Sequence, residues 1–191
     1  MNQKSDIQFI EQVLSGRTNA FSHIVERHKN KAFNLALRIC GNYEEAEEIT
    51  QDSFVKAYRA LGEFRMKSSF ATWLYRIVYN SSISHVRSRK ARILSLEDFP
   101  ADASDFLTAG STEEEADKEY MNSIINFALQ KLNEDERGLI TLYYYEELSL
   151  EELEEVTGIS KSNIKVKMFR ARQKMHAIIE KAENKNYIYH E

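Results

Sequence analysis

Hydrophobic residues recur every three or four positions along most of the chain, whereas the strict alternation of a half-buried strand is hard to find. This spacing predicts amphipathic helices, and the protein is therefore predicted to be all-α. In the N-terminal half we expect helices over about 5–16, 19–41 and 42–62, and a fourth that begins at Ser68 or Ser69. The apolar residues of the third helix, expected to face inward, are Ile49, Phe54, Val55, Tyr58 and Leu61. The apolar stripe of the fourth helix consists of Phe70, Trp73, Leu74, Ile77 and Val78.

Helical periodicity is lost over 94–111, where the chain contains Pro100, Gly110 and several aspartates and serines. Such a composition predicts a linker and a domain boundary. The segment has too little apolar surface to offset the entropy lost on ordering, so we expect a mobile, acidic tether. It would join two small helical domains, 1–93 and 112–191. The sequence leaves open whether these two domains pack together.

Helices are predicted to resume at about Thr112 and to continue to Leu132. Asn133 and Glu136 then form a capping-box pattern, in which each side chain satisfies a backbone N–H at the start of a helix. The last residues, 184–191, have the composition of a frayed tail.

A short acidic helix, a glycine turn and a basic helix follow one another over 148–172. Ser149 and Glu152 form a second capping-box pattern, Gly158 stands where a helix end favours a left-handed residue, and Ser160 can cap the next helix. The predicted apolar stripes are Leu150, Leu153 and Val156, and then Ile164, Met168, Ala171 and Met175. One packed face and one basic face are typical of a helix-turn-helix that enters the major groove. The alternative is an ordinary bundle with solvated lysines.

The formal net charge of −4 conceals a strong segregation of charge along the 191 residues. Every charged residue over 65–92 is basic, and 161–174 is basic again. The segments 97–119 and 134–155 are acidic, with one basic exception in each. Two basic segments indicate two surfaces for an anionic polymer, and the acidic ones indicate basic or self-shielding contacts.

Several other classes of protein find no support in the sequence. Cys40 is the one cysteine, so neither an internal disulfide nor a thiol-rich metal site is expected, and a reducing cytoplasm fits. No signal peptide precedes the first helix and no apolar run could span a bilayer, so no membrane insertion is expected. Because no clustered nucleophile, glycine-rich phosphate loop or metal-ligand spacing appears, we predict neither enzymatic activity nor a cofactor or metal.

The fourth helix and the loop before it combine aromatic and basic residues, which suits unpaired DNA because bases stack on aromatic rings while phosphates pair with cations. Phe70 and Trp73 belong to the apolar stripe and are expected in the core. Phe64, in the loop, is the better candidate for a base contact, and Asn80 could read a base edge. The whole set is Phe64, Phe70, Trp73, Tyr75 and Tyr79 with Arg65, Lys67, Arg76 and Arg87.

Two motifs carry a family resemblance that covers most of 18–181 outside the linker. The second conserved region of bacterial sigma factors is similar to the run EEAEEITQDSFVKAYRAL over 44–61, then Phe64-Arg65, SFATWLYRI over 69–77, and Asn80. Their fourth region is similar to the helix-turn-helix with KVKMFRAR over 165–172. The order and spacing of the two motifs resemble the extracytoplasmic-function (ECF) group, which keeps these two regions alone.

The resemblance implies a factor that binds core RNA polymerase, recognises promoter DNA and assists its melting. Docking on the clamp helices of the β′ subunit is implied for Glu48, Gln51 and Asp52. Contacts with the minus-ten element are implied for Phe64, Arg65, Lys67, Ser68, Ser69, Arg76, Asn80 and Arg87. Contacts with the minus-thirty-five element are implied for Lys161, Lys165, Val166, Lys167, Phe169, Arg170 and Arg172. The β-subunit flap and an anti-sigma factor are further expected partners.

Some positions depart from the family pattern. Val166 stands where many members have serine, and Met66 and Lys67 replace a glycine and an acid in the base-capturing loop. These positions concern which promoter is read rather than family membership. Two rival classes remain, a one-component regulator with a ligand-binding N-terminal half and a helical anti-sigma or adaptor protein. The helix with Gln51 and the basic, aromatic fourth helix favour the sigma factor, because a ligand-sensing domain requires neither of them.

Overall fold

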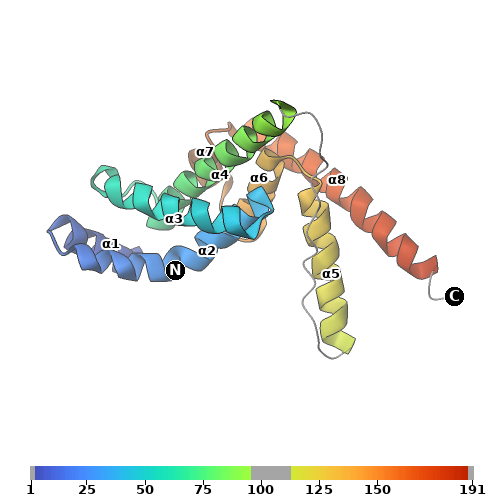
Figure 1. Ribbon diagram of the computed structural model, residues 1–191, viewed down its shortest axis with the longest axis horizontal. Coiled ribbons are helices and arrows are strands. Elements are labelled where there is room, and N and C mark those ends of the chain that lie inside the picture. The colour runs from blue at the N-terminus through green and yellow to red at the C-terminus, as the bar shows by residue number, and fades with distance from the viewer. Residues whose placement is uncertain (1–2, 96–112, 189–191) are drawn as a thin grey trace.

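The computed structural model describes residues 3–95 and 113–188. Over these residues the chain forms eight α-helices and two 3-10 turns with no strand, which confirms the all-α prediction (Figure 1). The N-terminal elements are α1 (Gln3–Leu14), η1 (Thr18–Ala20), α2 (Phe21–Cys40), α3 (Tyr43–Arg59), η2 (Leu61–Glu63) and α4 (Phe70–Ser95). The C-terminal elements are α5 (Glu113–Gln130), α6 (Glu134–Tyr144), α7 (Leu150–Thr157) and α8 (Lys161–Ile188). Most of the predicted tether lies outside the described residues.

Local hydrogen bonds set most helix boundaries where the sequence predicts them. The side chain of Asn42 accepts from the N–H of Glu45 at the start of α3. Both predicted capping boxes are confirmed, Asn133 with Glu136 at α6 and Ser149 with Glu152 at α7. Gly158 ends α7 with φ of 71°. Glycine adopts this left-handed conformation at the lowest energetic cost because it has no side chain.

Several details of the helix ends differ from the prediction. Helix α3 ends at Arg59 rather than Gly62, because the chain tightens into η2. At the start of α8 the N–H of Lys161 donates to the carboxylate of Glu154 (3.2 Å), so an acid of the preceding helix occupies the role expected of Ser160. Helix α8 also continues to Ile188, so the frayed tail predicted from residue 184 is wrong for 184–188.

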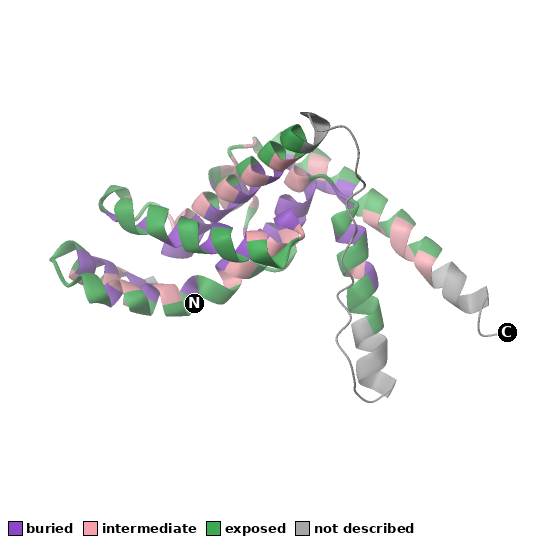
Figure 2. Cartoon of the chain, viewed as in Figure 1, coloured by how far each residue is buried: buried purple, intermediate pink, exposed green. Residues whose placement is uncertain are grey.

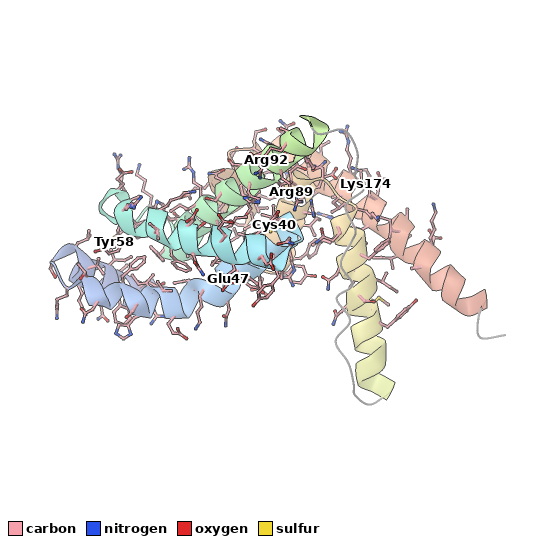
Figure 3. The ribbon with its side chains drawn as sticks, in the orientation of Figure 1. Cys40, Glu47, Tyr58, Arg89, Arg92 and Lys174 are labelled. Carbon is pink, nitrogen blue, oxygen red and sulfur yellow. The ribbon has the colours of Figure 1, made fainter. Side chains whose placement is uncertain are left out.

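In the N-terminal half, α2, α3 and α4 pack on one another around fully buried side chains such as Ile24, Leu35 and Leu74. Cys40 lies in this core at the end of α2, and burial raises the pKa of its thiol. Beside it, Arg89 of α4 donates to the Cys40 carbonyl oxygen (3.2 Å) and to Glu45 of α3 (2.7 Å) (Figure 3). This arginine therefore ties three helices together.

The two halves of the chain share one hydrophobic core. Helix α6 lies against α2 and α4, and α7 lies against α4, so the buried faces of all these helices turn inward together (Figures 1 and 2). The residues that the C-terminal half contributes are Leu139, Leu142, Leu148, Leu153, Val156, Ile164 and Met168. A second, smaller cluster of Leu129, Leu132, Ile140 and Ala171 joins α5, α6 and α8. Separating the halves would expose the apolar side chains of the shared core to water, which is unfavourable.

Close backbone approach shows how tightly the halves meet. A Cβ atom on Gly138 of α6 would lie 2.5 Å from Cε2 of Tyr79 in α4, and 3.5 Å from Cδ1 of Ile39 in α2. The absence of a side chain at Gly138 therefore allows α6 to sit against both helices of the N-terminal half.

Candidate functional site

One exposed edge of α3 carries the residues expected to dock on polymerase. Glu48, Gln51 and Asp52 are all exposed, while Ile49 and Phe54 of the same helix are buried. Val55 was expected among the apolar residues that face inward, but this is wrong, since the side chain is 46% exposed. It stands one turn after Gln51 and Asp52, so it adds an apolar contact to the same edge.

The loop before α4 ends in a cluster of three aromatic rings. The half-buried ring of Phe64 packs edge-on against Phe70 (5.7 Å between centroids) and lies 5.4 Å from Trp73. Phe70 is buried and Trp73 is half-buried, as expected for the apolar stripe of α4. Ser69 accepts from the N–H of Thr72 (3.0 Å) and so caps α4, while Ser68 donates to Glu155 of α7 (2.6 Å).

Tyr75 and Tyr79 are buried between the two halves, so they are not the DNA-facing aromatic residues that the sequence suggested. Tyr75 donates to the carboxylate of Glu146, and Tyr79 donates to Asp135 (3.4 Å). Burial raises the pKa of both phenols, and the neighbouring carboxylates raise it further. Both hydroxyls therefore keep their protons at neutral pH and serve as hydrogen-bond donors.

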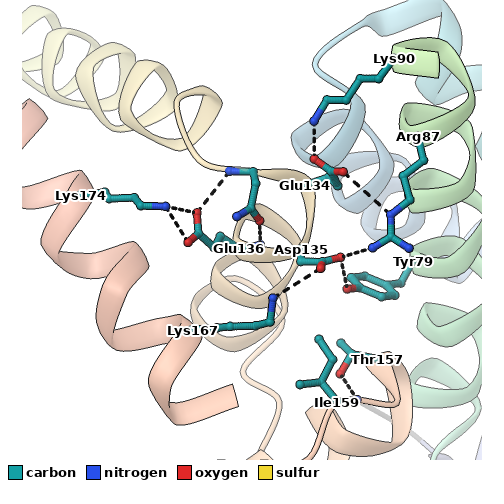
Figure 4. Close-up of polar contacts among 11 residues, drawn as sticks. Tyr79, Arg87, Lys90, Glu134, Asp135, Glu136, Thr157, Ile159, Lys167 and Lys174 are labelled. Carbon is teal, nitrogen blue, oxygen red and sulfur yellow. Dashed lines mark hydrogen bonds and ion pairs between the residues drawn. The ribbon is translucent and has the colours of Figure 1, made fainter. Parts of the chain in front are cut away.

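The basic residues of this half fall into two groups. Arg65, Lys67 and Arg76 are exposed, as is Asn80. Arg87 and Lys90 are exposed too, but they pair with acids of the C-terminal half: Arg87 with Asp135 (3.1 Å) and Glu134 (3.9 Å), and Lys90 with Glu134 (Figure 4).

The exposed face of α8 begins one turn into the helix. Ile164, Met168 and Ala171 are buried, as predicted, and Met175 packs on the second cluster. Lys165, Val166, Phe169 and Arg170 are exposed, and the ring of Phe169 is 60% accessible. Val166, Phe169 and Arg170 are three and four positions apart, so they present two apolar groups and one cation side by side.

Several other basic side chains of α8 have partners within the chain. Lys161 pairs with Glu151 of α7 (2.7 Å), and Lys167 with Asp135 of α6 (3.5 Å). The hydrogen bond from Lys161 lowers the pKa of Glu151 and raises that of Lys161. Arg172 lies 5.9 Å from the ring of Tyr144.

The partners of these cations are the residues that sequence reasoning did not single out. Asp135 and Glu146 lie in the acidic segment 134–155, whose composition indicated basic or self-shielding contacts. Glu146 also accepts from Lys31 of α2 (2.9 Å), and its side chain is only 5% exposed. The charge pattern could suggest that this segment pairs with basic side chains, but it could not identify those side chains.

Across 3–95 and 113–188 no group of three or more metal-binding side chains comes together. None of the helices there combines the length and apolar character that crossing a bilayer requires.

Comparison with known proteins identifies two conserved regions in the chain. Residues 24–92 match Sigma-70 region 2, and residues 123–175 match Sigma-70, region 4. The RNA polymerase sigma-H factor of Pseudomonas aeruginosa is 32% identical over 180 residues, which cover 91% of this chain and 93% of that protein. The ECF RNA polymerase sigma factor SigW of Bacillus subtilis is 33% identical over 176 residues, covering 86% of this chain and 91% of that protein.

Solved structures agree in fold. The sigma factor RpoE, in complex with the anti-sigma factor NepR from Bartonella quintana, superposes with a TM-score of 0.70 at 22% identity, covering 84% of this chain and 96% of that chain. CnrH in complex with the cytosolic domain of CnrY gives a TM-score of 0.64 at 25% identity, covering 90% of this chain and 95% of that chain. From these matches and from its two conserved regions, the chain belongs to the ECF group of the sigma-70 family of RNA polymerase sigma factors.

Proposed function

We propose that this protein is a transcription initiation factor that binds core RNA polymerase, recognises a class of promoters and assists their melting. The observation that carries the proposal is the coexistence of two exposed surfaces within the two matched regions. One is the α3 edge with Glu48, Gln51 and Asp52, and the other is the α8 face with Phe169 and Arg170. A protein of this kind acts by positioning DNA and polymerase rather than by catalysing a reaction itself.

Each surface is assigned a partner in this proposal. Residues 1–93 form the domain for core polymerase and the minus-ten element, residues 94–111 the linker, and residues 112–191 the domain for the minus-thirty-five element. The α3 edge docks on the clamp helices of the β′ subunit, while the C-terminal domain meets the flap of the β subunit. An anti-sigma factor is a further partner, as the solved complexes of related proteins suggest, and the cytoplasm is the compartment.

The DNA-binding residues are divided between two elements of the promoter. For the minus-ten element, Phe64 and Asn80 hold a nucleobase turned out of the duplex. The basic side chains around them contact phosphates; these are Arg65, Lys67, Arg76 and Arg87, with Ser68 and Ser69 in the loop. For the minus-thirty-five element, the α8 residues are Lys161, Lys165, Val166, Lys167, Phe169, Arg170 and Arg172. Val166 and Phe169 offer the apolar contact that a thymine methyl group favours.

Phe64→Ala tests the melting step directly. Stacking of one base on an aromatic ring contributes about 1–3 kcal/mol. We therefore expect the variant, bound to core polymerase, to populate the open complex at least about tenfold less while it still occupies the upstream element. Permanganate reactivity of unpaired thymines measures opening, and footprinting of the minus-thirty-five region serves as the control. Normal melting by Phe64→Ala would remove this residue from the base pocket.

Arg170→Ala and Arg172→Ala form a matched pair that separates base reading from phosphate binding. Arginine pairs best with guanine in the major groove, and one such contact discriminates against the wrong base by about 1–3 kcal/mol. Arg170→Ala should therefore relax the preference at one or two upstream positions. Arg172→Ala should weaken binding to all sequences alike, and it should reduce the slope of log affinity against log salt concentration by about one.

Selection from a promoter with a randomised upstream element, with the full chain bound to core polymerase at two salt concentrations, measures both effects. If Arg170→Ala lowers every affinity equally and leaves the selected sequence unchanged, Arg170 is a phosphate contact. The assignment of the reading face of α8 would then be wrong.

A further inference from the structure

Helix α1 lies outside both matched regions, yet a buried carboxylate fastens it to α2. Asp6 of α1 is only 4% exposed, and it accepts hydrogen bonds from Arg27 and from Nε2 of His28 (3.1 Å), both on α2. A carboxylate is costly to bury unless cations and hydrogen-bond donors compensate for the lost water. Asp6 is therefore held by these partners rather than by solvent.

His28 contributes a polar ring to the interior of the N-terminal half, where it is fully buried. Burial lowers the pKa of His28 although Asp6 raises it, and Arg27 and Lys31 lower it further, so the ring is neutral at neutral pH. A carboxylate can only accept, so Nε2 carries the proton, and Nδ1 is an acceptor with no hydrogen-bond partner among the described residues. An apolar ring would leave no such buried atom, so packing alone does not require a histidine here.

The His28 ring also packs on the aromatic cluster at the start of α4. Its centroid lies 5.4 Å from that of Phe70, which is buried. Phe70 in turn contacts Phe64 (5.7 Å) and Trp73 (5.5 Å). Helix α1 also lies against α4 and η2, the two elements that flank the loop with Phe64. A continuous series of contacts thus runs from Asp6 through His28 and Phe70 to Phe64.

Rings that are held in place suit the capture of a base. A ring that can turn loses rotational freedom when a base stacks on it, whereas a ring already fixed by its neighbours does not. Phe64 is half-buried, so part of it packs on Phe70 and Trp73 while the rest stays accessible. The position of His28 limits where Phe70 can lie, because a close-packed interior leaves little free space. The hydrogen bond to Asp6 fixes the orientation of the His28 ring.

We propose that α1 is a positioning element for promoter melting, in which Asp6 acts through His28 and Phe70 to hold Phe64 ready to stack on a base. The proposal rests on the proposed function of Phe64 in capturing that base. Asp6 itself is buried and is a positioning residue. Its removal should therefore matter for melting only while Phe64 is present.

A double-mutant cycle of Asp6→Ala and Phe64→Ala, in the full chain bound to core polymerase, tests this path. Asp6→Ala alone should lower open-complex occupancy roughly threefold or more, a share of the loss expected from Phe64→Ala. In a chain that already carries Phe64→Ala, Asp6→Ala should have no further effect, because residues that act through one another are not additive. Permanganate reactivity of unpaired thymines measures opening, and protection of the minus-thirty-five element confirms that the complex still forms.

Trp73 reports on the cluster in the free chain. It is the one tryptophan of the protein, and its ring lies 5.4 Å from that of Phe64. Asp6→Ala should increase the quenching of Trp73 emission by acrylamide, since the cluster is held less firmly. Glu11→Ala is the matched control, because it removes an exposed acid from the same helix. It should change neither the quenching nor the opening.

His28→Gln is a second variant, and it replaces Asp6→Ala in the cycle if that protein does not fold. Glutamine keeps an N–H donor for Asp6 but removes the ring that packs on Phe70. His28→Gln should therefore increase the quenching of Trp73 and lower opening as Asp6→Ala does. Circular dichroism checks that each variant is folded.

Two results would overturn the proposal while Phe64 keeps its role in melting. Additive losses in the cycle would mean that Asp6 acts elsewhere, and unchanged quenching in both variants would mean that the cluster does not depend on α1. If Phe64→Ala itself melts the promoter normally, the assigned base pocket fails and the positioning role fails with it. Increased quenching in Asp6→Ala would then identify the assigned function, rather than the contacts, as the error.

Discussion

Leu139→Ala should destabilise both halves of this protein at once. Leu139 of α6 is fully buried in the cluster that also contains Leu74 and Val78 of α4. Truncation of a buried leucine removes its transfer free energy and leaves a cavity, which together cost about 2–5 kcal/mol. Because the cluster crosses the interface, we expect the loss of hydrogen-exchange protection to extend from α6 into α2 and α4. Chemical denaturation followed by exchange at individual amides measures both quantities.

Leu129→Ala is the matched control, since Leu129 is equally buried but belongs to the smaller cluster of α5, α6 and α8. It should lower the stability of the C-terminal helices and leave α2 and α4 protected. If Leu139→Ala also leaves α2 and α4 unaffected, the two halves unfold as independent units. The shared core would then contribute little to the stability of the N-terminal half.

Gln51→Ala combined with Asp52→Ala should weaken binding to core polymerase by about 2 kcal/mol or more, close to thirtyfold, if these are central contacts of the interface. Both side chains are exposed, so their truncation should not disturb the fold. Val55→Ala should weaken binding further, because its exposed side chain extends the same edge. Titration of labelled variants with core polymerase measures the affinity, and circular dichroism reports the fold.

A double substitution on α2, Glu26→Ala with Asn30→Ala, removes one exposed acid and one exposed amide elsewhere in the same half. Its affinity for polymerase should stay within about twofold of the unaltered chain, because surface changes outside an interface have little effect on binding. Equal losses in the two double variants would point to a general effect of charge and would contradict docking through the α3 edge.

The sequence by itself determined the features that depend on neighbouring residues. Asn133 with Glu136, Ser149 with Glu152 and the left-handed Gly158 are set by hydrogen bonds and dihedral preferences within one helical turn, and all three predictions are confirmed. The buried stripe of α8 follows from the same periodicity. The family was equally accessible, because its motifs are continuous runs of residues.

Only the tertiary structure decided which side chains meet across the chain. Arg87 and Asp135 are 48 residues apart, and Lys31 and Glu146 are 115 apart, so no local pattern relates them. Tyr75 and Tyr79 are aromatic residues of a kind that suits DNA, yet both are buried, whereas Val55 fits an apolar stripe, yet it is exposed. The physical reason is that burial and ion pairing depend on which helix arrives from elsewhere in the fold. Periodicity tells only which side of a helix is apolar.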